Sequence, residues 1–315
     1  MDYFDTVMPV LLSFSISIIL CPVVIPFLKR LKFGQYVRED GPRSHLKKAG
    51  TPTMGGLIIL ISVAVTSSLY LRDYPEILPI LFSTVGFGLI GFLDDYIKVV
   101  MRRSLGLRAW QKLVLQFGVT VIFAYYYTEQ LHYEMQMLIP FTGGIATGRY
   151  ISLPIGLFLP FLFFVMVGTV NGTNFTDGLD GLASSVTLLV AVFFTVVAVC
   201  AAVAGALMGF LVFNVYPASV FMGDTGSLAL GGFVASTALL LKMPLYILIV
   251  GAIYLIEVLS VILQVGYFKI THGKRIFKMA PIHHHFEQSG WSETKVVAVF
   301  SIVTALFCLI ALAAL

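Results

Sequence analysis

Nine apolar runs of membrane-spanning length dominate this 315-residue sequence. They cover residues 7–28, 55–71, 77–93, 110–127, 154–170, 182–216, 226–241, 245–268 and 294–315. A helix of about 20 apolar residues crosses the hydrocarbon core of a bilayer. Hydrophobic residues make up 58% of the chain and charged residues only 11%, which argues against a soluble enzyme. We therefore predict an all-α integral membrane protein.

The basic residues indicate the orientation of the spans. Seven lie in residues 29–48, five in 98–112 and five in 269–295. Cytoplasmic loops are enriched in lysine and arginine, so we expect these three segments to be cytoplasmic. Residues 182–216 must then cross the membrane twice, with a tight turn around Cys200 to Gly205. The sequence thus predicts ten transmembrane helices, with both termini extracytoplasmic and the active site on the cytoplasmic face.

The remaining composition adds few constraints. Cys21, Cys200 and Cys308 all lie inside apolar runs, so we interpret them as packing residues rather than disulfide or metal ligands. The net charge of +4 reflects the positions of the loops and does not indicate a nucleic-acid partner. Residues 128–153 are expected to form a small external hairpin or surface helix. No internal repeat is obvious, so we expect residues 1–315 to form a single membrane domain.

The third apolar run ends in two adjacent acids, Asp94 and Asp95, followed by Lys98. Adjacent carboxylates repel each other unless they share a cation or a proton, which indicates a Mg2+ site or a base beside one. The alternative is a solvated helix end. Acids at the depth of a membrane are costly, and this favours the functional interpretation.

A second polar segment runs from Asn171 to Gly181 and alternates glycine with short polar residues. Its candidate binding residues are Asn171, Asn174, Asp177 and Asp180. Exposed backbone N–H groups and short oxygen ligands of this kind can hold the ribose, base or phosphates of a nucleotide. The alternative is a polar turn between two spans.

A third segment places Asp224 between glycines just before the next apolar run. A carboxylate at a helix N-terminus, with Gly223 beside it, is well placed to hold Mg2+ near a bound phosphate, or simply to cap the helix. Phe221 could stack on a base, although an aromatic residue at an interface is often only a membrane anchor. Asn214 begins the same segment.

Nine basic side chains could bind phosphates, although the positive-inside rule alone explains most of them. They are Lys47, Lys48, Lys98, Arg102, Arg103, Lys112, Lys274, Arg275 and Lys278. Glu257 differs because it lies in the middle of an apolar run, with Gln264 two turns later. We expect it to face protein, either in a structural pair or in a groove for a lipid phosphate.

Three consecutive histidines, His283, His284 and His285, follow Pro281 in the last polar segment. A zinc site on a helix needs ligands spaced along one face, so a three-histidine zinc site from this run alone is not expected. Two compatible interpretations remain, namely contact with a phosphate or leaving group, and a structural loop packed by Pro281 and Phe286.

These motifs together indicate a reaction class. Clustered acids, a divalent cation and basic side chains suit phosphoryl transfer, in which catalysis is mostly positioning and charge neutralisation. A site at the level of the membrane predicts that one substrate is a lipid.

Five motifs resemble those of the phospho-N-acetylmuramoyl-pentapeptide transferase family, within the polyprenyl-phosphate N-acetylhexosamine-1-phosphate transferase superfamily. They are Gly50-Thr51-Pro52-Thr53-Met54-Gly55-Gly56, Asp94-Asp95, Asn171 to Gly181, Phe221-Met222-Gly223-Asp224-Thr225-Gly226 and Pro281-Ile282-His283-His284-His285-Phe286-Glu287. The first and last of these resemble this branch of the superfamily in particular, and the motifs cover nearly the whole chain.

The resemblance implies transfer of phospho-MurNAc-pentapeptide from UDP-MurNAc-pentapeptide to undecaprenyl phosphate, which gives lipid I and UMP. It also implies Mg2+, a bacterial inner-membrane location and a homodimer. Asp224 would be the Mg2+ ligand, and Asp94 or Asp95 would deprotonate the lipid phosphate. Lys98, Asn174, Asp177, Asp180, Asn214 and Phe221 would line the nucleoside and diphosphate region, and Lys48, Lys112, His283 and His284 would contact phosphates or sugar. Asn171, Gly223 and His285 are further substrate-side candidates, and His283 is also a catalytic one.

Two other functions remain open. A sister transferase that uses UDP-N-acetylglucosamine would share the Mg2+ chemistry and differ in its sugar-facing loop. A transporter could use the ten helices and Glu257 as a path, but no inverted repeat is visible and the acids gather on one face. For the transferase, a single displacement and a two-step route through an aspartyl intermediate are both compatible with the sequence.

Overall fold

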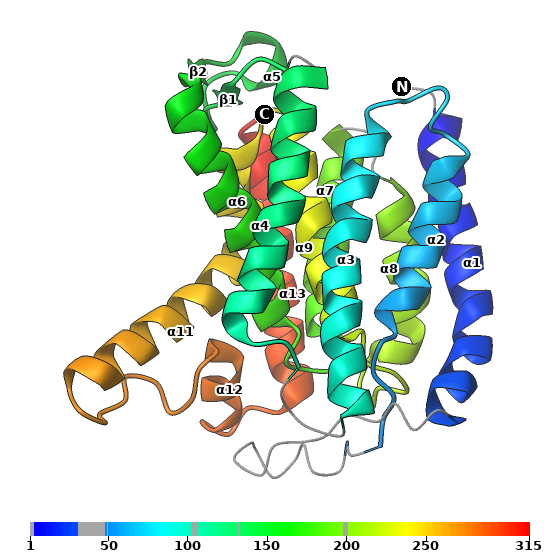
Figure 1. Ribbon diagram of the computed structural model, residues 1–315, viewed down its shortest axis with the longest axis vertical. Helices are drawn as coiled ribbons and strands as arrows, with labels where there is room; N and C mark the ends of the chain where they lie inside the picture. The colour runs from blue at the N-terminus through cyan, green and yellow to red at the C-terminus, as the bar shows by residue number, and fades with distance from the viewer. Residues whose placement is uncertain (1–2, 31–47, 49, 102–105, 131–132, 198–200) are drawn as a thin grey trace.

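The computed structural model describes residues 3–30, 48, 50–101, 106–130, 133–197 and 201–315. Most of the long helices run roughly along one axis, and a two-stranded sheet lies at one end of them (Figure 1). The helices are α1 (Tyr3–Arg30), α2 (Gly56–Ser68), α3 (Ile77–Val100), α4 (Ala109–Tyr125), α5 (Gly144–Thr147), α6 (Ile155–Thr176), α7 (Leu182–Val197), α8 (Ala201–Asn214), α9 (Gly223–Leu240), α10 (Ile247–Val250), α11 (Ala252–Ile270), α12 (Ile282–Glu287) and α13 (Glu293–Ala313). The strands are β1 (Gln136–Leu138) and β2 (Tyr150–Ser152), and short π and 3-10 turns occupy Tyr126–Gln130 and Pro244–Tyr246.

The helices confirm the predicted apolar runs. Each of the nine runs overlaps a helix, and the double-length run at 182–216 contains two, α7 and α8. Cys200 lies outside the described residues, as do Lys47, Arg102 and Arg103. The prediction of a turn as far as Gly205 is wrong, because α8 already begins at Ala201; the alanines there favour helix.

Two polar segments that we expected to be loops are partly helical. Helix α6 continues through Asn171 to Thr176, and the histidine run forms the short helix α12. The hydroxyl of Thr173 donates to the Thr169 carbonyl at 3.0 Å, and that of Thr176 donates to the Gly172 carbonyl at 2.9 Å. These side chains are satisfied by the helix itself, so the helix does not need to end where the polar residues begin.

The segment at 128–153 forms the small hairpin that the sequence predicted. Strands β1 and β2 are antiparallel, with Gln136 opposite Ser152 and Leu138 opposite Tyr150. The short helix α5 lies between them in the chain. This end of the molecule also holds the start of α1 and the end of α13 (Figure 1).

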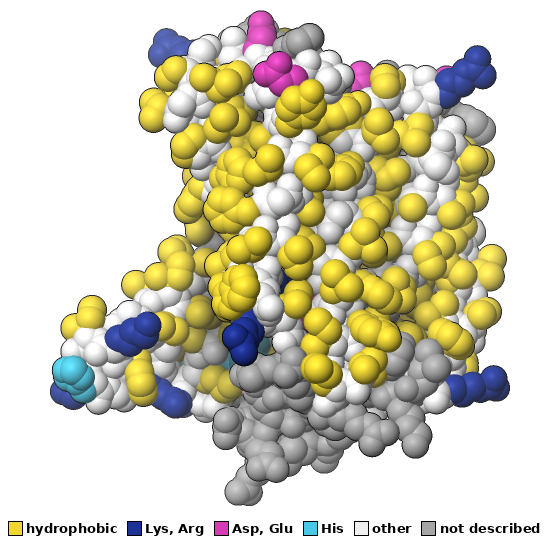
Figure 2. Space-filling model, viewed as in Figure 1, with side chains coloured by type: hydrophobic (Ala, Val, Ile, Leu, Met, Phe, Trp, Pro, Cys, Tyr) yellow, Lys and Arg dark blue, Asp and Glu magenta, His cyan; other side chains and the backbone are white. Residues whose placement is uncertain are grey.

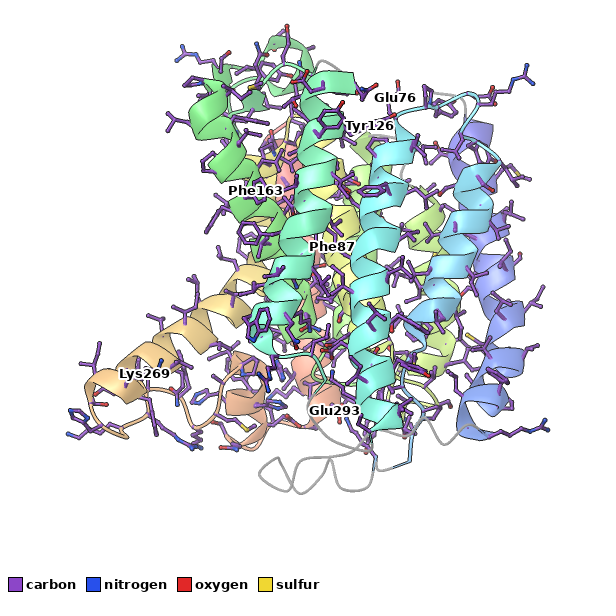
Figure 3. The ribbon with its side chains drawn as sticks, in the orientation of Figure 1. Glu76, Phe87, Tyr126, Phe163, Lys269 and Glu293 are labelled. Atoms are coloured by element: carbon purple, nitrogen blue, oxygen red, sulfur yellow. The ribbon has the colours of Figure 1, made fainter. Side chains whose placement is uncertain are left out.

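The helices carry the apolar surface of a multi-pass membrane protein. Five of them, α1, α3, α6, α11 and α13, are long and apolar enough to cross a membrane, and α2, α7 and α8 are shorter apolar helices. Hydrophobic side chains cover the middle of the face in Figure 2, and charged side chains lie mostly toward its two ends. Glu76 and Tyr126 lie at one end, whereas Lys269 and Glu293 lie at the other, which we call the Glu293 end (Figure 3).

Helix α9 is the centre of the bundle. Every residue from Thr225 to Leu240 is buried, and many of them are glycine, alanine or serine. Small residues let neighbouring helices approach closely within a membrane. A side chain at Gly231 would be 2.5 Å from the Cα atom of Val170 in α6, and one at Gly232 would be 2.6 Å from the ring of Phe87 in α3. Helices α3 and α6 are therefore held against α9, and their ends carry the acidic motifs.

Candidate active site

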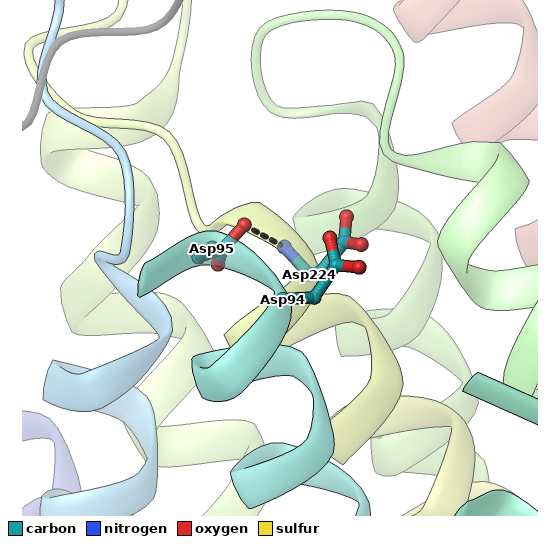
Figure 4. A group of neighbouring side chains, drawn as sticks. All are labelled: Asp94, Asp95 and Asp224. Atoms are coloured by element: carbon teal, nitrogen blue, oxygen red, sulfur yellow. Dashed lines mark hydrogen bonds between the residues drawn. The ribbon is translucent and has the colours of Figure 1, made fainter. Parts of the chain in front are cut away.

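Three carboxylates meet at the Glu293 end, where α3 ends and α9 begins. Asp94 and Asp95 lie near the end of α3, and Asp224 lies in the first turn of α9. One oxygen atom of each side chain lies within 4.8 Å of the others (Figure 4). The approach requires a glycine at the crossing, because a side chain at Gly91 would overlap the backbone carbonyl of Asp224. The structure thus brings together acids from two separate motifs.

Asp95 caps the start of α9 from the neighbouring helix. Its carboxylate accepts hydrogen bonds from the backbone N–H of Asp224 at 3.2 Å and from that of Thr225 at 2.9 Å. The Thr225 hydroxyl donates to the same carboxylate at 2.7 Å. The first N–H groups of a helix have no partner within the helix, and a negative charge there is favourable. Asp95 is therefore satisfied although only 2% of the residue is exposed.

Asp94 is bound to the chain that follows α3. Its Oδ1 atom accepts the backbone N–H of Leu107 at 2.9 Å, and its Oδ2 atom lies 2.6 Å from the Lys98 ammonium group. The residue is 3% exposed. Asp94 thus fixes the chain at Leu107, shortly before α4, which supplies Lys112.

Asp224 is the most open of the three acids. Its side chain is 18% exposed, compared with 4% for Asp94 and 3% for Asp95. Its Oδ2 atom lies 2.6 Å from the Lys112 ammonium group and 3.1 Å from that of Lys98. Its oxygens are therefore the most accessible of the cluster to a bound ion.

The donor set fits a divalent metal ion. The three carboxylates could hold a metal, and carboxylate oxygens are the ligands that Mg2+ prefers. Lys98 and Lys112 compensate two of the three negative charges, which leaves the cluster with a net charge of the sign that attracts a cation. The lysines also provide fixed positive charge for phosphate groups.

The end of α6 supplies the polar groups beside Asp224. The Asn174 amide donates to Asp224 Oδ1 at 3.1 Å and to the Ser227 hydroxyl at 2.8 Å. Asp177, the residue after α6, is partly exposed. Desolvation raises its pKa well above the usual range, and the negative charges of Asp224 and Asp95 raise it further. Asn174 therefore belongs to the same polar site as the three acids, and the charges of two of these acids also act on Asp177.

The histidines of α12 have three different environments. His283 is buried, and its Nδ1 atom lies 3.0 Å from Oε1 of the buried Glu257. This confirms the structural pair as one of the two interpretations of Glu257. His284 Nδ1 lies 2.7 Å from Glu287 Oε2. His285 Nδ1 accepts the backbone N–H of Lys278 at 3.1 Å, within its own segment.

A second group of charges joins four segments of the chain. Lys48 Nζ lies 2.6 Å from Asp180 Oδ1 and also contacts Glu293 at the start of α13. The other oxygen of Asp180 accepts the backbone N–H of Ala218 at 2.9 Å. The Phe221 ring centroid lies 6.0 Å from Lys48 Nζ. We call Lys48, Asp180 and Glu293 the Lys48 group. Sequence reasoning missed Glu293, because an acid in the first turn of a helix is ordinarily explained by the helix dipole.

The remaining candidates, Asn171, Asn214 and Gly223, shape the segments around the site. The Asn171 amide donates to the side-chain oxygen of Gln116 in α4 at 2.8 Å. Asn214 accepts the Ser184 hydroxyl at 2.6 Å and donates to the Val220 carbonyl at 2.9 Å, so it shapes the segment before α9. Gly223 has φ of 68°, and a side chain there would meet the carboxylate of Asp95. These hydrogen bonds tie Asn171 and Asn214 to residues other than the three acids.

The Gly50–Gly56 motif holds the segment that leads into α9. The backbone N–H of Phe221 donates to the Pro52 carbonyl at 2.9 Å. In return, Gly55 N–H donates to the Phe221 carbonyl at 2.8 Å and Gly56 N–H donates to the Met222 carbonyl at 2.9 Å. The two glycines permit this pairing, because a side chain at Gly56 would overlap the backbone of α9.

Comparisons with known proteins agree with these motifs. The model of glycosyl transferase family 4 matches residues 77–242, and the phospho-N-acetylmuramoyl-pentapeptide-transferase signature 1 matches residues 48–60. A phospho-N-acetylmuramoyl-pentapeptide-transferase of Caldicellulosiruptor bescii is 52% identical over 98% of this chain and 97% of its own length. A protein of the same name from Acetivibrio thermocellus is 54% identical over 97% of this chain and 94% of its own length. Another, from Clostridium perfringens, is 51% identical over 98% of this chain and 98% of its own length.

We predict that Gly178→Ala destabilises the protein. A Cβ atom at Gly178 would overlap Nε2 of His283, which is buried and held through its other nitrogen by Glu257. Overpacking of this kind costs about 1–3 kcal/mol. Thermal unfolding in detergent should show a lower midpoint for this variant. Gly156→Ala is the control, because a Cβ atom there meets nothing within 4 Å. Equal midpoints for the two variants would contradict the packing argument.

Proposed function

Because this chain belongs to the phospho-N-acetylmuramoyl-pentapeptide transferase family, we propose that it transfers phospho-MurNAc-pentapeptide from UDP-MurNAc-pentapeptide to undecaprenyl phosphate. The products are lipid I and UMP, and the reaction is the first membrane step of peptidoglycan synthesis. The observation that carries the proposal is the cluster of Asp94, Asp95 and Asp224 beside Lys98 and Lys112, at one end of an apolar bundle. A lipid phosphate and a soluble nucleotide can both reach a site in this position.

The proposed chemistry is a single displacement. An oxygen of undecaprenyl phosphate attacks the phosphorus that carries the sugar and forms a new P–O bond. The bond from that phosphorus to the bridging oxygen breaks, and UMP leaves with this oxygen and its electron pair. Charge accumulates on the phosphate oxygens, so a cationic and fixed environment lowers the barrier.

Each residue of the acidic cluster has its own role in this proposal. Mg2+ bound by Asp224 would neutralise the diphosphate. Lys98 and Lys112 hold Asp224 in place and supply further positive charge. Asp95 keeps the start of α9 in position through its backbone hydrogen bonds. We assign deprotonation of the lipid phosphate to Asp94, because both oxygens of Asp95 accept backbone N–H groups, whereas Asp94 Oδ2 contacts a lysine side chain that a bound phosphate can draw away.

In this proposal, the nucleotide end of the donor lies on the side of Asp224 away from the lipid phosphate. Asn174 donates a hydrogen bond to Asp224, and Asp180, six residues later in the chain, belongs to the Lys48 group, next to Phe221. Phe221 offers a ring on which a base can stack. His283 and His284 approach the same region from α12, where a side chain at Gly178 would overlap His283.

We further propose that the whole chain is one transferase domain in the bacterial inner membrane and that it acts as a homodimer. The ten-span topology, with both termini outside, completes this proposal. Two exposed positions at opposite ends of the molecule test the orientation in the membrane, Ala146 in α5 and Ser289 after α12.

We predict that Ala146→Cys is labelled from outside the cell and that Ser289→Cys is not. Each substitution is made in a chain without Cys21, Cys200 and Cys308, and intact spheroplasts are treated with a membrane-impermeant thiol reagent. Ser289→Cys should react only after the membrane is opened. The reverse pattern would place the acidic cluster on the extracytoplasmic face and contradict the topology.

We predict that Asp224→Asn loses activity by about a hundredfold or more, the scale seen when a group that stabilises transition-state charge is removed. UMP release is measured with purified protein, and thermal unfolding checks the fold. Asp73→Asn, the same change at an exposed position, is the control and should keep wild-type activity. A chelator should stop wild-type turnover, and added Mg2+ should restore it. Normal turnover in Asp224→Asn would remove this residue from the mechanism.

We predict that the protein releases UMP with UDP-MurNAc-pentapeptide and not with UDP-N-acetylglucosamine. Each nucleotide sugar is supplied in turn with undecaprenyl phosphate, and the lipid product is identified by mass. Product from UDP-N-acetylglucosamine alone would instead indicate the sister transferase. Solute uptake into liposomes, without a Mg2+-dependent product from either donor, would indicate a transporter.

A further inference from the structure

Glu293 contacts two residues that are far from it in the sequence. It is the first residue of α13. Its Oε1 atom accepts the backbone N–H of Asp180 at 2.7 Å and also contacts the Lys48 ammonium group. Only 8% of the side chain is exposed. A desolvated carboxylate is costly unless it is fully paired, so these two contacts have to be maintained together.

The contacts of Glu293 immobilise the rest of the Lys48 group. The Lys48 ammonium group lies between Glu293 and Asp180, and Asp180 also accepts the backbone N–H of Ala218. Lys48 Nζ lies 6.0 Å from the centroid of the Phe221 ring. One carboxylate at the start of the last helix therefore connects the segments that contain Lys48, Asp180 and Phe221.

The charge of the Lys48 group argues for a positional role. One ammonium group faces two carboxylates, so the positive charge of Lys48 is already balanced within the protein. A lysine in this state is a fixed donor rather than a free counter-ion for a phosphate. Asp224 and Glu293 have different partners. Asp224 is held by Lys98 and Lys112, whereas Glu293 binds Lys48 and the backbone of Asp180.

We propose that Glu293 is a positioning residue for the nucleotide half of the donor substrate, acting through Lys48 and the backbone of Asp180. The inference rests on the proposed function. Without Glu293, the Asp180 N–H and one side of the Lys48 ammonium group lose their acceptor, and the Asp180 segment loses its fixed position. The acids that act on the phosphorus keep their own partners, so donor binding suffers and the chemical step does not.

The test compares Glu293→Gln and Glu293→Ala in the full-length protein. Glutamine retains an oxygen for the Asp180 N–H and loses the negative charge that faces Lys48, whereas alanine loses both the oxygen and the charge. We expect KM for UDP-MurNAc-pentapeptide to rise about tenfold in the alanine variant and less in the glutamine variant, the scale of one lost hydrogen bond to a charged group. The kcat value should stay within about threefold of wild type.

A double-mutant cycle tests whether the effect passes through Lys48. Residues in contact give non-additive effects, so Lys48→Met should raise KM less in the Glu293→Ala background than in wild type. Independent effects of the two substitutions would overturn the proposed route.

Glu134→Gln is the matched control, because it removes an exposed carboxylate–lysine pair with Lys242, outside the proposed binding machinery. Its KM and kcat should equal those of wild type. A lower kcat with unchanged KM in both Glu293 variants, as expected from a loss of folded protein alone, would overturn the inference, and so would a wild-type KM in both. A wild-type protein that is inactive with the donor would instead refute the proposed function.

Discussion

The candidate site depends on the contact between the end of α3 and the start of α9. A helix start buried in a bundle leaves N–H groups that need acceptors. Asp95 supplies the acceptor from the neighbouring helix, and the same contact places Asp94 and Asp224 side by side. The contact is possible only because glycine stands at position 91, where a side chain would overlap the backbone of α9. The packing of the bundle and the position of the acids are therefore fixed together.

Three carboxylates at this depth repel one another and lose hydration, so the cluster needs compensation. Backbone N–H groups compensate Asp95, and lysines compensate Asp94 and Asp224. The compensation is unequal, because Asp224 is paired with lysine side chains while Asp95 is bound to the backbone. A ligand that displaces a lysine from Asp224 leaves the backbone intact, whereas one that displaces the partners of Asp95 would disturb the start of α9. This difference is the reason why we propose that Asp224 binds the ion and that Asp95 positions the start of α9.

The sequence predicted the helices well, because hydrophobic length is a local property that a membrane enforces on each segment. It also singled out Asp94, Asp95 and Asp224, which the structure brings together, since acids next to apolar runs are costly unless they have a use. It did not predict that α6 continues through Asn174, because the partners that satisfy this polar end come from α9. It also missed the contact of Lys48 with Glu293, which are 245 residues apart. Such pairs depend on how distant helices pack, and no local pattern contains that information.

One short stretch, Asn174 to Asp180, contacts the acidic cluster, lies against His283 and belongs to the Lys48 group. Asn174 binds Asp224, the position of Gly178 lies against His283, and Asp180 binds Lys48 and Glu293. Its first residues are helical and therefore stiff, and its last residue is held by side chains from two other segments. In the proposed function, the spacing between the phosphate side and the nucleotide side would thus be set by a piece of chain fixed at both ends. A donor whose phosphates and nucleoside are joined by covalent bonds needs such a fixed spacing, because a change at either end would move its reacting phosphorus away from the attacking oxygen.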